Sequence, residues 1–170
     1  MSSAGISIEV SIDDARVRSA LMQLISLGAD PAPVMRDLAA YGEASTRERF
    51  HAETAPDGSG WKKSLRAQIS GGKTLTASGH LGDSISSDSG RDWSAWGTNS
   101  VYAAIHQFGG TIKPKTPGGT LRFRLANGAF VSTKSVTLPA RPYLGVNADD
   151  EAEMTNLVMR RLRIAAQAGA

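Results

Sequence analysis

The chain opens on a strict alternation of apolar and polar residues, in which four apolar side chains are spaced by serine and glutamate over 6–12. A period of two is typical of a strand with one buried face, so this pattern predicts a strand. Asp13 and Asp14 then predict the start of a helix over about 14–27, because carboxylates can cap the free amides of a first turn. The apolar stripe of this helix comprises Val17, Leu21, Leu24 and Ile25, and Gly28 follows as a stop signal.

Helical spacing returns twice further along the chain. Asp30 and Pro31 predict a helix that runs to about His51, since proline is tolerated in a first turn. Gly42 lies inside this stretch and lowers its helical propensity. A last helix is predicted from about Asp149, with acidic residues at its start and arginines near its end, which is the polarity that the helix dipole favours. The apolar stripe of this last helix comprises Met154, Leu157, Val158, Leu162 and Ala165.

The middle of the chain predicts a short helix after a first hairpin. The hairpin is expected over 84–97, and Trp93 and Trp96 should then point to opposite faces, one to the core and one to the rim or an interface. The helix is expected over 101–108 and ends at Gly109-Gly110, which provide a sharp reversal with positive φ. In this helix we expect a core face and an outer face, formed respectively by Tyr102, Ile105 and Phe108 and by His106 and Gln107.

A second hairpin is predicted by Asn127-Gly128, the dipeptide best suited to a tight hairpin turn. Before this turn, three apolar residues alternate with Arg122 and Arg124 and are expected to point inward: Leu121, Phe123 and Leu125. After the turn, residues 129–138 are expected to return as the partner strand.

The remaining stretches, 54–83 and 111–119, are rich in glycine, serine and proline, and we expect them to be long loops that order on assembly. Together the elements predict one α+β domain over 1–170. Its antiparallel sheet is expected to consist of long β-hairpins packed against the N-terminal and C-terminal helices.

Composition excludes several classes of protein. The chain has 170 residues, of which 41% are hydrophobic and 21% charged, as is ordinary for a soluble globular domain. It has no cysteine, which excludes disulfides, thiolate nucleophiles, iron–sulfur clusters and cysteine zinc sites. Its apolar runs are far shorter than the ~20 residues that span a bilayer, and its first residues lack the basic and apolar regions of a signal peptide. We therefore expect a cytoplasmic protein with no membrane partner.

No catalytic or metal-binding motif is accompanied by the other residues that it requires. Gly72-Lys73-Thr74 resembles the end of a phosphate-binding loop, but Ala67 stands where that motif requires glycine. His51, His80 and His106 form no metal-binding pair, and no serine lies in the elbow motif of hydrolases. We therefore expect no enzyme, cofactor or metal, and a hydrolase with a dispersed site is kept as a minor alternative.

Basic residues concentrate between Trp93 and Ala148, a stretch without any acidic residue. Such a stretch favours contact with nucleic acid or with an acidic protein, or it forms the solvated outer face of a hairpin. Its six basic residues are Lys113, Lys115, Arg122, Arg124, Lys134 and Arg141. For Arg141 we favour a partner in its own chain over one across an interface, because the flanking prolines fix it locally.

Several unusual segments follow one another in a fixed order. Pro56-Asp57-Gly58 precedes Trp61, LTASGHL occupies 75–81, YAAIHQFGG occupies 102–110, and PARPYLG at 139–145 leads into the last helix. This order, which spans about 45–165, resembles the phage virion morphogenesis family, the tail-completion or head–tail joining proteins of Mu-like tailed phages. The segments at 102–110 and 139–145 are the most specific, whereas nothing is carried over to 111–138.

The resemblance implies a non-enzymatic structural protein of the virion, assembled in the host cytoplasm. Such proteins lie in the neck at the head-proximal end of the tail, where they form a ring, commonly sixfold, through which DNA passes. The implied partners are further copies of the chain, a head connector or stopper protein, and a tail tube or terminator protein. Two alternatives stay open: a tail terminator that caps the tube, and a DNA-binding accessory protein that uses the basic segment 113–141.

Within this interpretation, some residues are candidates for contact with neighbouring subunits or partners. Trp61 lies in a polar loop, where it either anchors an interface or packs on its own domain. His106 and Gln107 are expected to offer hydrogen bonds to a neighbour. The full set of interface candidates is Trp61, His106, Gln107, Lys113, Lys115, Arg122, Arg124 and Arg141.

Overall fold

The computed structural model describes residues 15–26 and 30–168, which form two compact units. We call them the arm unit, residues 49–84 and 99–143, and the helical unit, residues 15–26, 30–48, 85–98 and 144–168. The strand expected over 6–12 and the stop signal expected at Gly28 lie outside the described residues. The described elements are helices and antiparallel strands, which confirms the α+β class.

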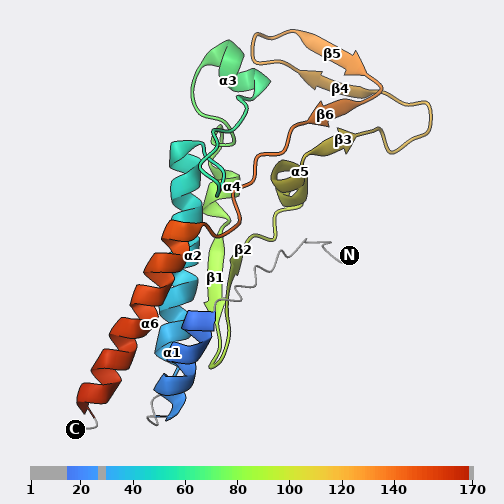
Figure 1. Cartoon of the computed structure of the whole chain (residues 1–170). Helices are drawn as coiled ribbons and strands as arrows, with labels where there is room; N and C mark the ends of the chain where they lie inside the picture. The colour runs from blue at the N-terminus through green and yellow to red at the C-terminus, as the bar shows by residue number, and fades with distance from the viewer. Residues whose placement is uncertain (1–14, 27–29, 169–170) are drawn as a thin grey trace. The chain divides into compact units, whose positions relative to one another are not determined.

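Three helices and one hairpin build the helical unit (Figure 1). They are α1 (Ala15–Ser26), α2 (Ala32–Ala52, whose last residues belong to the arm unit), α6 (Ala148–Ala168), and the hairpin of β1 (Ser86–Ser89) and β2 (Ser94–Gly97). Helix α1 packs against α6, and Asp37 of α2 forms a 2.7 Å ion pair with Arg161 of α6. The core that these elements enclose includes Val34, Leu38, Trp96, Met154 and Val158, so two residues of the apolar stripe predicted for the last helix are confirmed in the core, and Leu157, Leu162 and Ala165 are half-buried.

The start of α6 is fixed to α2 by one buried carboxylate, that of Asp150. Its Oδ1 accepts hydrogen bonds from the hydroxyls of Tyr41, at 3.1 Å, and Ser45, at 2.5 Å. Its Oδ2 accepts the backbone amide of Asn147, whose own side-chain oxygen accepts the amide of Asp150. These reciprocal bonds cap the helix and satisfy the charge that burial would otherwise penalise.

The β1–β2 hairpin lies on α2 through a close approach at Gly42. A Cβ added to Gly42 would lie 2.3 Å from Cδ2 of Trp96, so only glycine lets the indole reach the helix backbone. Trp96 is 6% exposed and Trp93 is 47% exposed, which confirms the prediction that one of the two lies in the core and the other does not.

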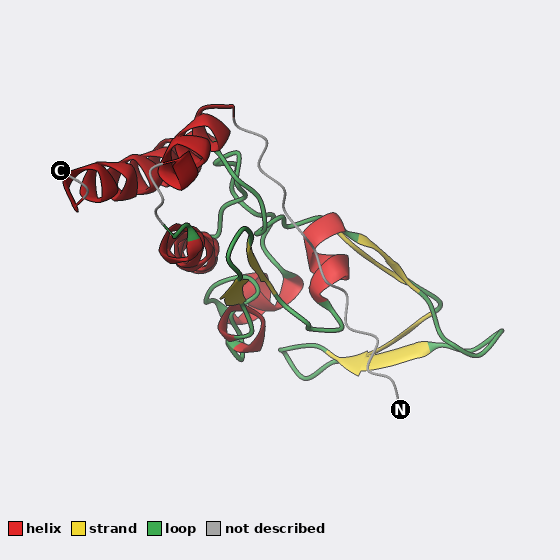
Figure 2. Ribbon diagram, turned by 90° about the horizontal axis from the view of Figure 1, so that it is seen from below, coloured by secondary structure: helices red, strands yellow, loops and turns green. Residues whose placement is uncertain are grey.

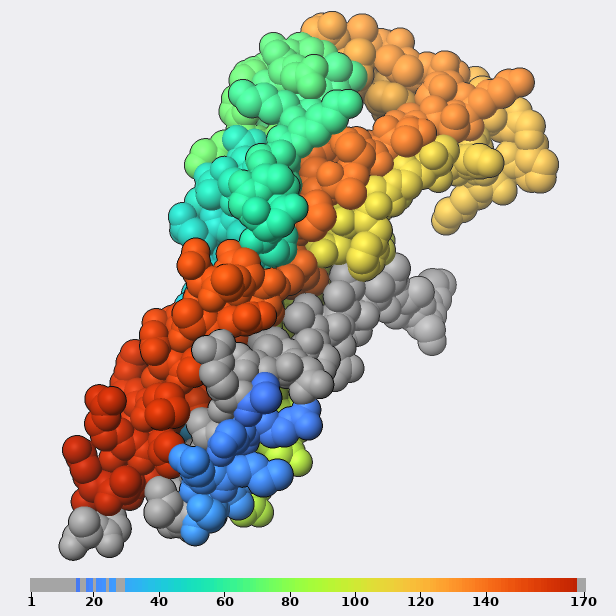
Figure 3. All heavy atoms as spheres, viewed as in Figure 1, coloured from blue at the N-terminus to red at the C-terminus, as the bar shows by residue number. Residues whose placement is uncertain are grey.

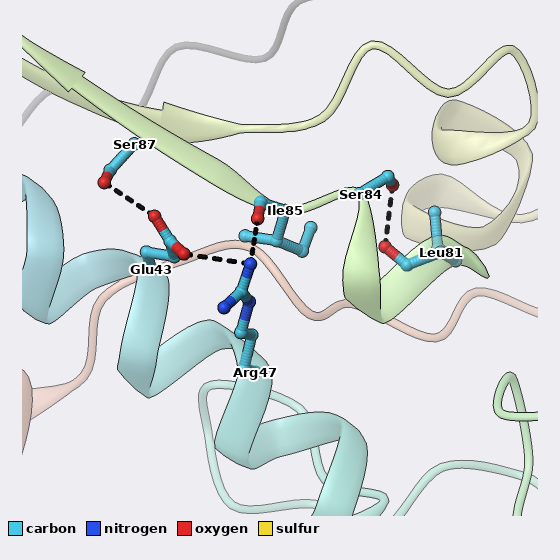
Figure 4. Close-up of polar contacts among 6 residues, drawn as sticks. All are labelled: Glu43, Arg47, Leu81, Ser84, Ile85 and Ser87. Atoms are coloured by element: carbon cyan, nitrogen blue, oxygen red, sulfur yellow. Dashed lines mark hydrogen bonds and ion pairs between the residues drawn. The ribbon is translucent and has the colours of Figure 1, made fainter. Parts of the chain in front are cut away.

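Beside this contact, Arg47 connects the helix to the hairpin (Figure 4). It pairs with Glu43 at 2.9 Å and donates to the carbonyl of Ile85 at 2.7 Å, and Ser87 donates to Glu43 at 2.6 Å. The hairpin is therefore attached to α2 by polar contacts as well as by the buried indole.

Three short helices and two strand pairs build the arm unit. The helices are α3 (Leu65–Ser70), α4 (His80–Asp83) and α5 (Ala103–Phe108). Strand β3 (Gly110–Ile112) pairs with β6 (Val136–Leu138), and β4 (Leu121–Arg124) pairs with β5 (Phe130–Thr133), all antiparallel. The expected loop over 54–83 thus contains two helices, because Ala67 and Leu81 are buried and anchor them.

The strands differ from the prediction in length and in connection. The turn at Asn127-Gly128 is present, but the return segment splits into β5 and β6, which pair with different strands. Thr133 and Ser135 exchange local hydrogen bonds at the break, a geometry that competes with a continuous ladder. The described strands are only three or four residues long and form three separate two-stranded sheets, so the expectation of one sheet with long hairpins is not confirmed.

Candidate interaction site

The two segments that carry the family resemblance meet inside the arm unit. The backbone amide of Arg141 donates to the carbonyl of His106 at 2.7 Å, and the amide of Tyr143 donates to Oε1 of Gln107 at 2.9 Å. The Tyr143 hydroxyl donates to the carbonyl of Ala103 at 3.2 Å. Helix α5 therefore provides the partners that the proline-rich segment 139–145 cannot find in a regular strand.

Aromatic rings and further hydrogen bonds close the other side of this segment. Phe50 packs edge-on against Trp61, with ring centroids 5.4 Å apart, and lies 5.1 Å from the ring of Tyr143. The Trp61 indole donates to the carbonyl of Pro142 at 2.7 Å, and Arg141 Nε donates to the carbonyl of Lys62 at 2.7 Å. We call Phe50, Trp61 and Tyr143 the aromatic base, since they hold residues 141–143 on both sides.

Burial shifts the ionisation of the groups in this region. It raises the pKa of Tyr143 to about 12, because the phenolate would be desolvated. It lowers the pKa of the Arg141 guanidinium, and it lowers the pKa of His106 below 6.5, an effect that the nearby charge of Arg141 reinforces. The buried Nδ1 of His106 has no hydrogen-bond partner within the described part of the chain.

The segment that resembles a phosphate-binding loop has structural partners instead. Lys73 Nζ donates to the carbonyl of His51 at 2.7 Å, and the amide of Thr74 donates to Oε1 of Glu53 at 2.5 Å. This hydrogen bond, more than any other interaction, lowers the pKa of Glu53. These contacts attach the segment to the end of α2.

An exposed arm, residues 110–138, extends from this base (Figure 1, Figure 2). It contains β3, β4, β5 and β6, and not one of its residues is buried. At its stem, a Cβ on Gly109 would lie 2.6 Å from the amide nitrogen of Ala140 and 2.9 Å from the carbonyl oxygen of Leu138. The positive φ of Gly109, 70°, allows this approach, so the arm leaves the base at a closely packed point.

The arm, drawn yellow to orange in the space-filling view (Figure 3), exposes aromatic and basic side chains. Phe130 is 82% exposed, and Phe123 and Ile112 are exposed as well. Arg124 lies over the ring of Phe130, 5.2 Å from its centroid, and donates to the carbonyl of Gly128 at 3.0 Å. The other basic residues of the arm are all exposed: Lys113, Lys115, Arg122 and Lys134. An apolar and cationic surface of this kind is typical of a protein–protein contact.

The interface candidates from the sequence fall into two groups. Lys113, Lys115, Arg122 and Arg124 lie together on the arm, exposed as an interface would need. The others lie in or beside the aromatic base: Trp61 is 7%, Gln107 8% and Arg141 4% exposed, and His106 is half-buried. The expectation that Gln107 faces outward is wrong, because its amide is used by Tyr143. Arg141 does bind within its own chain, as favoured.

Sequence reasoning missed the exposed apolar residues. Phe108 and Tyr102 were expected in the core but are 67% and 41% exposed, since Ala103 and Gln107 form the inner face of α5. Phe123 was expected to point inward and is 38% exposed. The alternation at 121–125 distinguishes the two faces of the strand but does not say which of them is covered.

Within the described ranges, no group of acidic and histidine residues could hold a metal ion. No helix in the same ranges is long and apolar enough to cross a membrane.

The sequence is similar to proteins of tailed phages. A model of the phage virion morphogenesis family matches residues 12–163. The "Putative capsid assembly protein G" of Escherichia phage Mu is 30% identical, over 94% of this chain and 97% of its own. The "Mu-like prophage FluMu G protein 2" of Haemophilus influenzae is 34% identical, over 86% of this chain and 90% of its own. No solved structure shows a significant match.

Proposed function

Because the chain belongs to the phage virion morphogenesis family, we propose that it is a structural protein of the phage neck. In this role it forms a sixfold ring at the head-proximal end of the tail and joins the tail to the head connector, and DNA passes through the lumen. The observation that supports the proposal is the arm, whose exposed apolar side chains are covered by no other described residue of the chain. The name of the Mu relative, which refers to capsid assembly, agrees with a position next to the head.

The division into a rigid base and an uncovered arm suits a protein that docks in sequence on preformed parts. The base positions the arm through the hydrogen bonds of residues 141–143 and the close contact at Gly109. The arm then offers aromatic and cationic groups that gain stability only when a partner covers them. The absence of acidic residues from 94–147 restricts that partner to a surface of neutral or negative charge.

Electron microscopy of lysates tests this role. The phage that encodes the chain is grown with its gene deleted, and with the gene restored from a plasmid as the control. Filled heads beside complete, unattached tails are expected in the deletion lysate, and infectious particles in the control. Overlong or ragged tails would favour the terminator alternative instead, and normal infectious particles from the deletion would overturn a structural role altogether.

A further inference from the structure

Charge is divided unequally between the two units of the chain. The arm unit holds eleven basic and three acidic residues, a formal net charge of +8. The described part of the helical unit holds eight basic and ten acidic residues, a net charge of −2. Opposite charges on different surfaces of one chain favour head-to-tail contact between copies, because each copy presents both partners of the pair.

Within the described residues, the apolar side chains of the arm stay uncovered. Two-stranded sheets are at best marginally stable alone, and no residue of those in the arm is buried. Phe130, Phe123 and Ile112 expose apolar surface that gains free energy only when it leaves water. DNA offers phosphates for the basic groups but nothing comparable for a β-strand with an outward phenylalanine. The apolar component therefore favours a protein partner over nucleic acid.

One surface of the helical unit complements both the positive charge and the exposed apolar side chains of the arm. This surface is the turn of the β1–β2 hairpin, residues 88–93, which we call the Trp93 turn. Trp93 is 47% exposed, and its ring lies so close to Gly90 that a Cβ there would be 2.2 Å from Nε1. One face of the indole is thus supported and the side chain keeps an exposed surface. The turn also exposes two acidic residues, Asp88 and Asp92, and only one basic residue, Arg91.

From this match we propose that the arm of one copy docks on the Trp93 turn of a second copy. Phe130 contacts the exposed indole, and Arg122 approaches the carboxylates of the turn, which is the combination of aromatic and cationic contacts that stabilises protein interfaces. The arm and the turn are different surfaces of the same chain, so the contact is heterologous and repeats from copy to copy. Such contacts generate a ring when the rotation closes. The inference rests on the proposed ring and names the surfaces that build it.

Cross-linking between engineered cysteines tests the contact directly, because the natural chain has no cysteine. Ser132→Cys places a thiol on the arm and Arg91→Cys places one on the Trp93 turn without removing either acid; both positions are exposed. As a matched control, Ala44→Cys replaces Arg91→Cys, at an exposed position of α2 in the same unit. Each pair is supplied to the deletion phage, infectious particles are purified, and a short thiol-specific cross-linker is added.

The expected result is a ladder of covalent multimers from the arm–turn pair, at least about tenfold stronger than from the control pair. A ladder of equal strength from the control overturns the proposal. So does a link confined to one chain, a link from Ser132→Cys to another virion protein, or no link in infectious particles. Particles that lack the chain altogether would refute the neck role separately. The same pairs are then cross-linked in the purified protein, where the ladder is again expected if copies dock as proposed.

Charge reversal gives a second, independent readout. Arg122→Glu or Asp92→Arg alone is expected to lower the yield of infectious particles by about tenfold or more, because each places like charges across the contact. The double variant is expected to restore most of that loss. Lys63→Glu, an exposed reversal in the arm unit but outside the arm, is the control and should have little effect. Equal losses from Lys63→Glu and Arg122→Glu, without rescue by Asp92→Arg, would indicate that the basic charge acts on DNA and would overturn the proposal.

Discussion

The contact between Gly42 and Trp96 gives a prediction whose sign is opposite to that expected from the sequence. In an isolated helix, Gly42→Ala would stabilise α2 by about 1 kcal/mol, because alanine has the highest helical propensity and glycine one of the lowest. In the structure, the new Cβ would lie 2.3 Å from Cδ2 of Trp96 and 2.5 Å from both Cε2 and Cε3. Carbon atoms prefer separations of about 3.5–4.0 Å, so the ring would have to retreat by more than about 1 Å.

Moving the ring lowers the stability of the fold because Trp96 is only 6% exposed and protein cores are closely packed. Overpacking of a core typically costs about 1–3 kcal/mol, and three ring atoms in collision favour the upper part of this range. After the gain in propensity is subtracted, we expect Gly42→Ala to lower the free energy of unfolding by about 1–2 kcal/mol. The effect should reverse in a chain that also carries Trp96→Ala, where the same substitution should stabilise by about 1 kcal/mol.

Denaturant unfolding followed by far-ultraviolet circular dichroism measures all four chains of this double-mutant cycle without depending on tryptophan fluorescence. Ala44→Gly calibrates the propensity in the same helix, because Ala44 is exposed, and should cost about 1 kcal/mol. If Gly42→Ala stabilised the chain that retains Trp96, the close approach of the hairpin to α2 would be refuted. A coupling energy of zero between the two substitutions would also refute this contact, since it would show that the two residues do not touch.

Three further predictions concern the arm unit. The pKa of His106 is lowered below 6.5 by burial, so its contribution to stability is complete above pH 6.5 and is lost as the pH falls through the lowered value; His106→Gln should flatten this acid limb in thermal melts. Burial raises the pKa of Tyr143 to about 12, so its contribution is complete below pH 10 and is lost as the pH rises toward 12. Tyr143→Phe should remove that alkaline loss and, through the lost hydrogen bond, cost about 1 kcal/mol at neutral pH in denaturant unfolding. Gly109→Ala should lower the free energy of unfolding by at least about 2 kcal/mol, because the new Cβ collides with backbone atoms and the residue keeps a strained positive φ. Gly58→Ala is the control, with a positive φ but open space around it, and should cost only about 1 kcal/mol. Equal losses from the two variants would contradict the close packing at Gly109.

The elements with a strong periodic pattern were predictable from the sequence. The stripe of Met154 and Val158, the boundaries of α2 and the turn at Asn127-Gly128 all follow from local rules that tertiary structure did not override. The role of Gly42 was not predictable, because a glycine within a helix shows its purpose only when the residue packed against it is known. The outward position of Phe108 was missed for a similar reason, since the inner face of α5 was decided by Tyr143, far away in the chain.

For the candidate site, sequence reasoning found the basic residues of the arm but not its aromatic ones. The four bases from Lys113 to Arg124 were singled out by the absence of acids around them, which is visible in the sequence. Phe123 was assigned to an inner face because alternation in a strand says that one face differs from the other. Alternation does not say whether the cover for the apolar face comes from the same chain.

That ambiguity has a physical consequence for the arm. A strand whose apolar residues alternate with arginines has the pattern of a half-buried strand, yet Phe123 on the apolar face and Phe130 on the arginine face are both exposed. Within the described residues no layer covers these phenylalanines, and exposed phenylalanines beside a marginal two-stranded sheet favour unfolding or aggregation of the arm unless another surface covers them. A cover from a second copy also explains why the arm is basic. Docking then brings it against the acidic turn of its neighbour, while its charge discourages two arms from pairing with each other through their exposed edges.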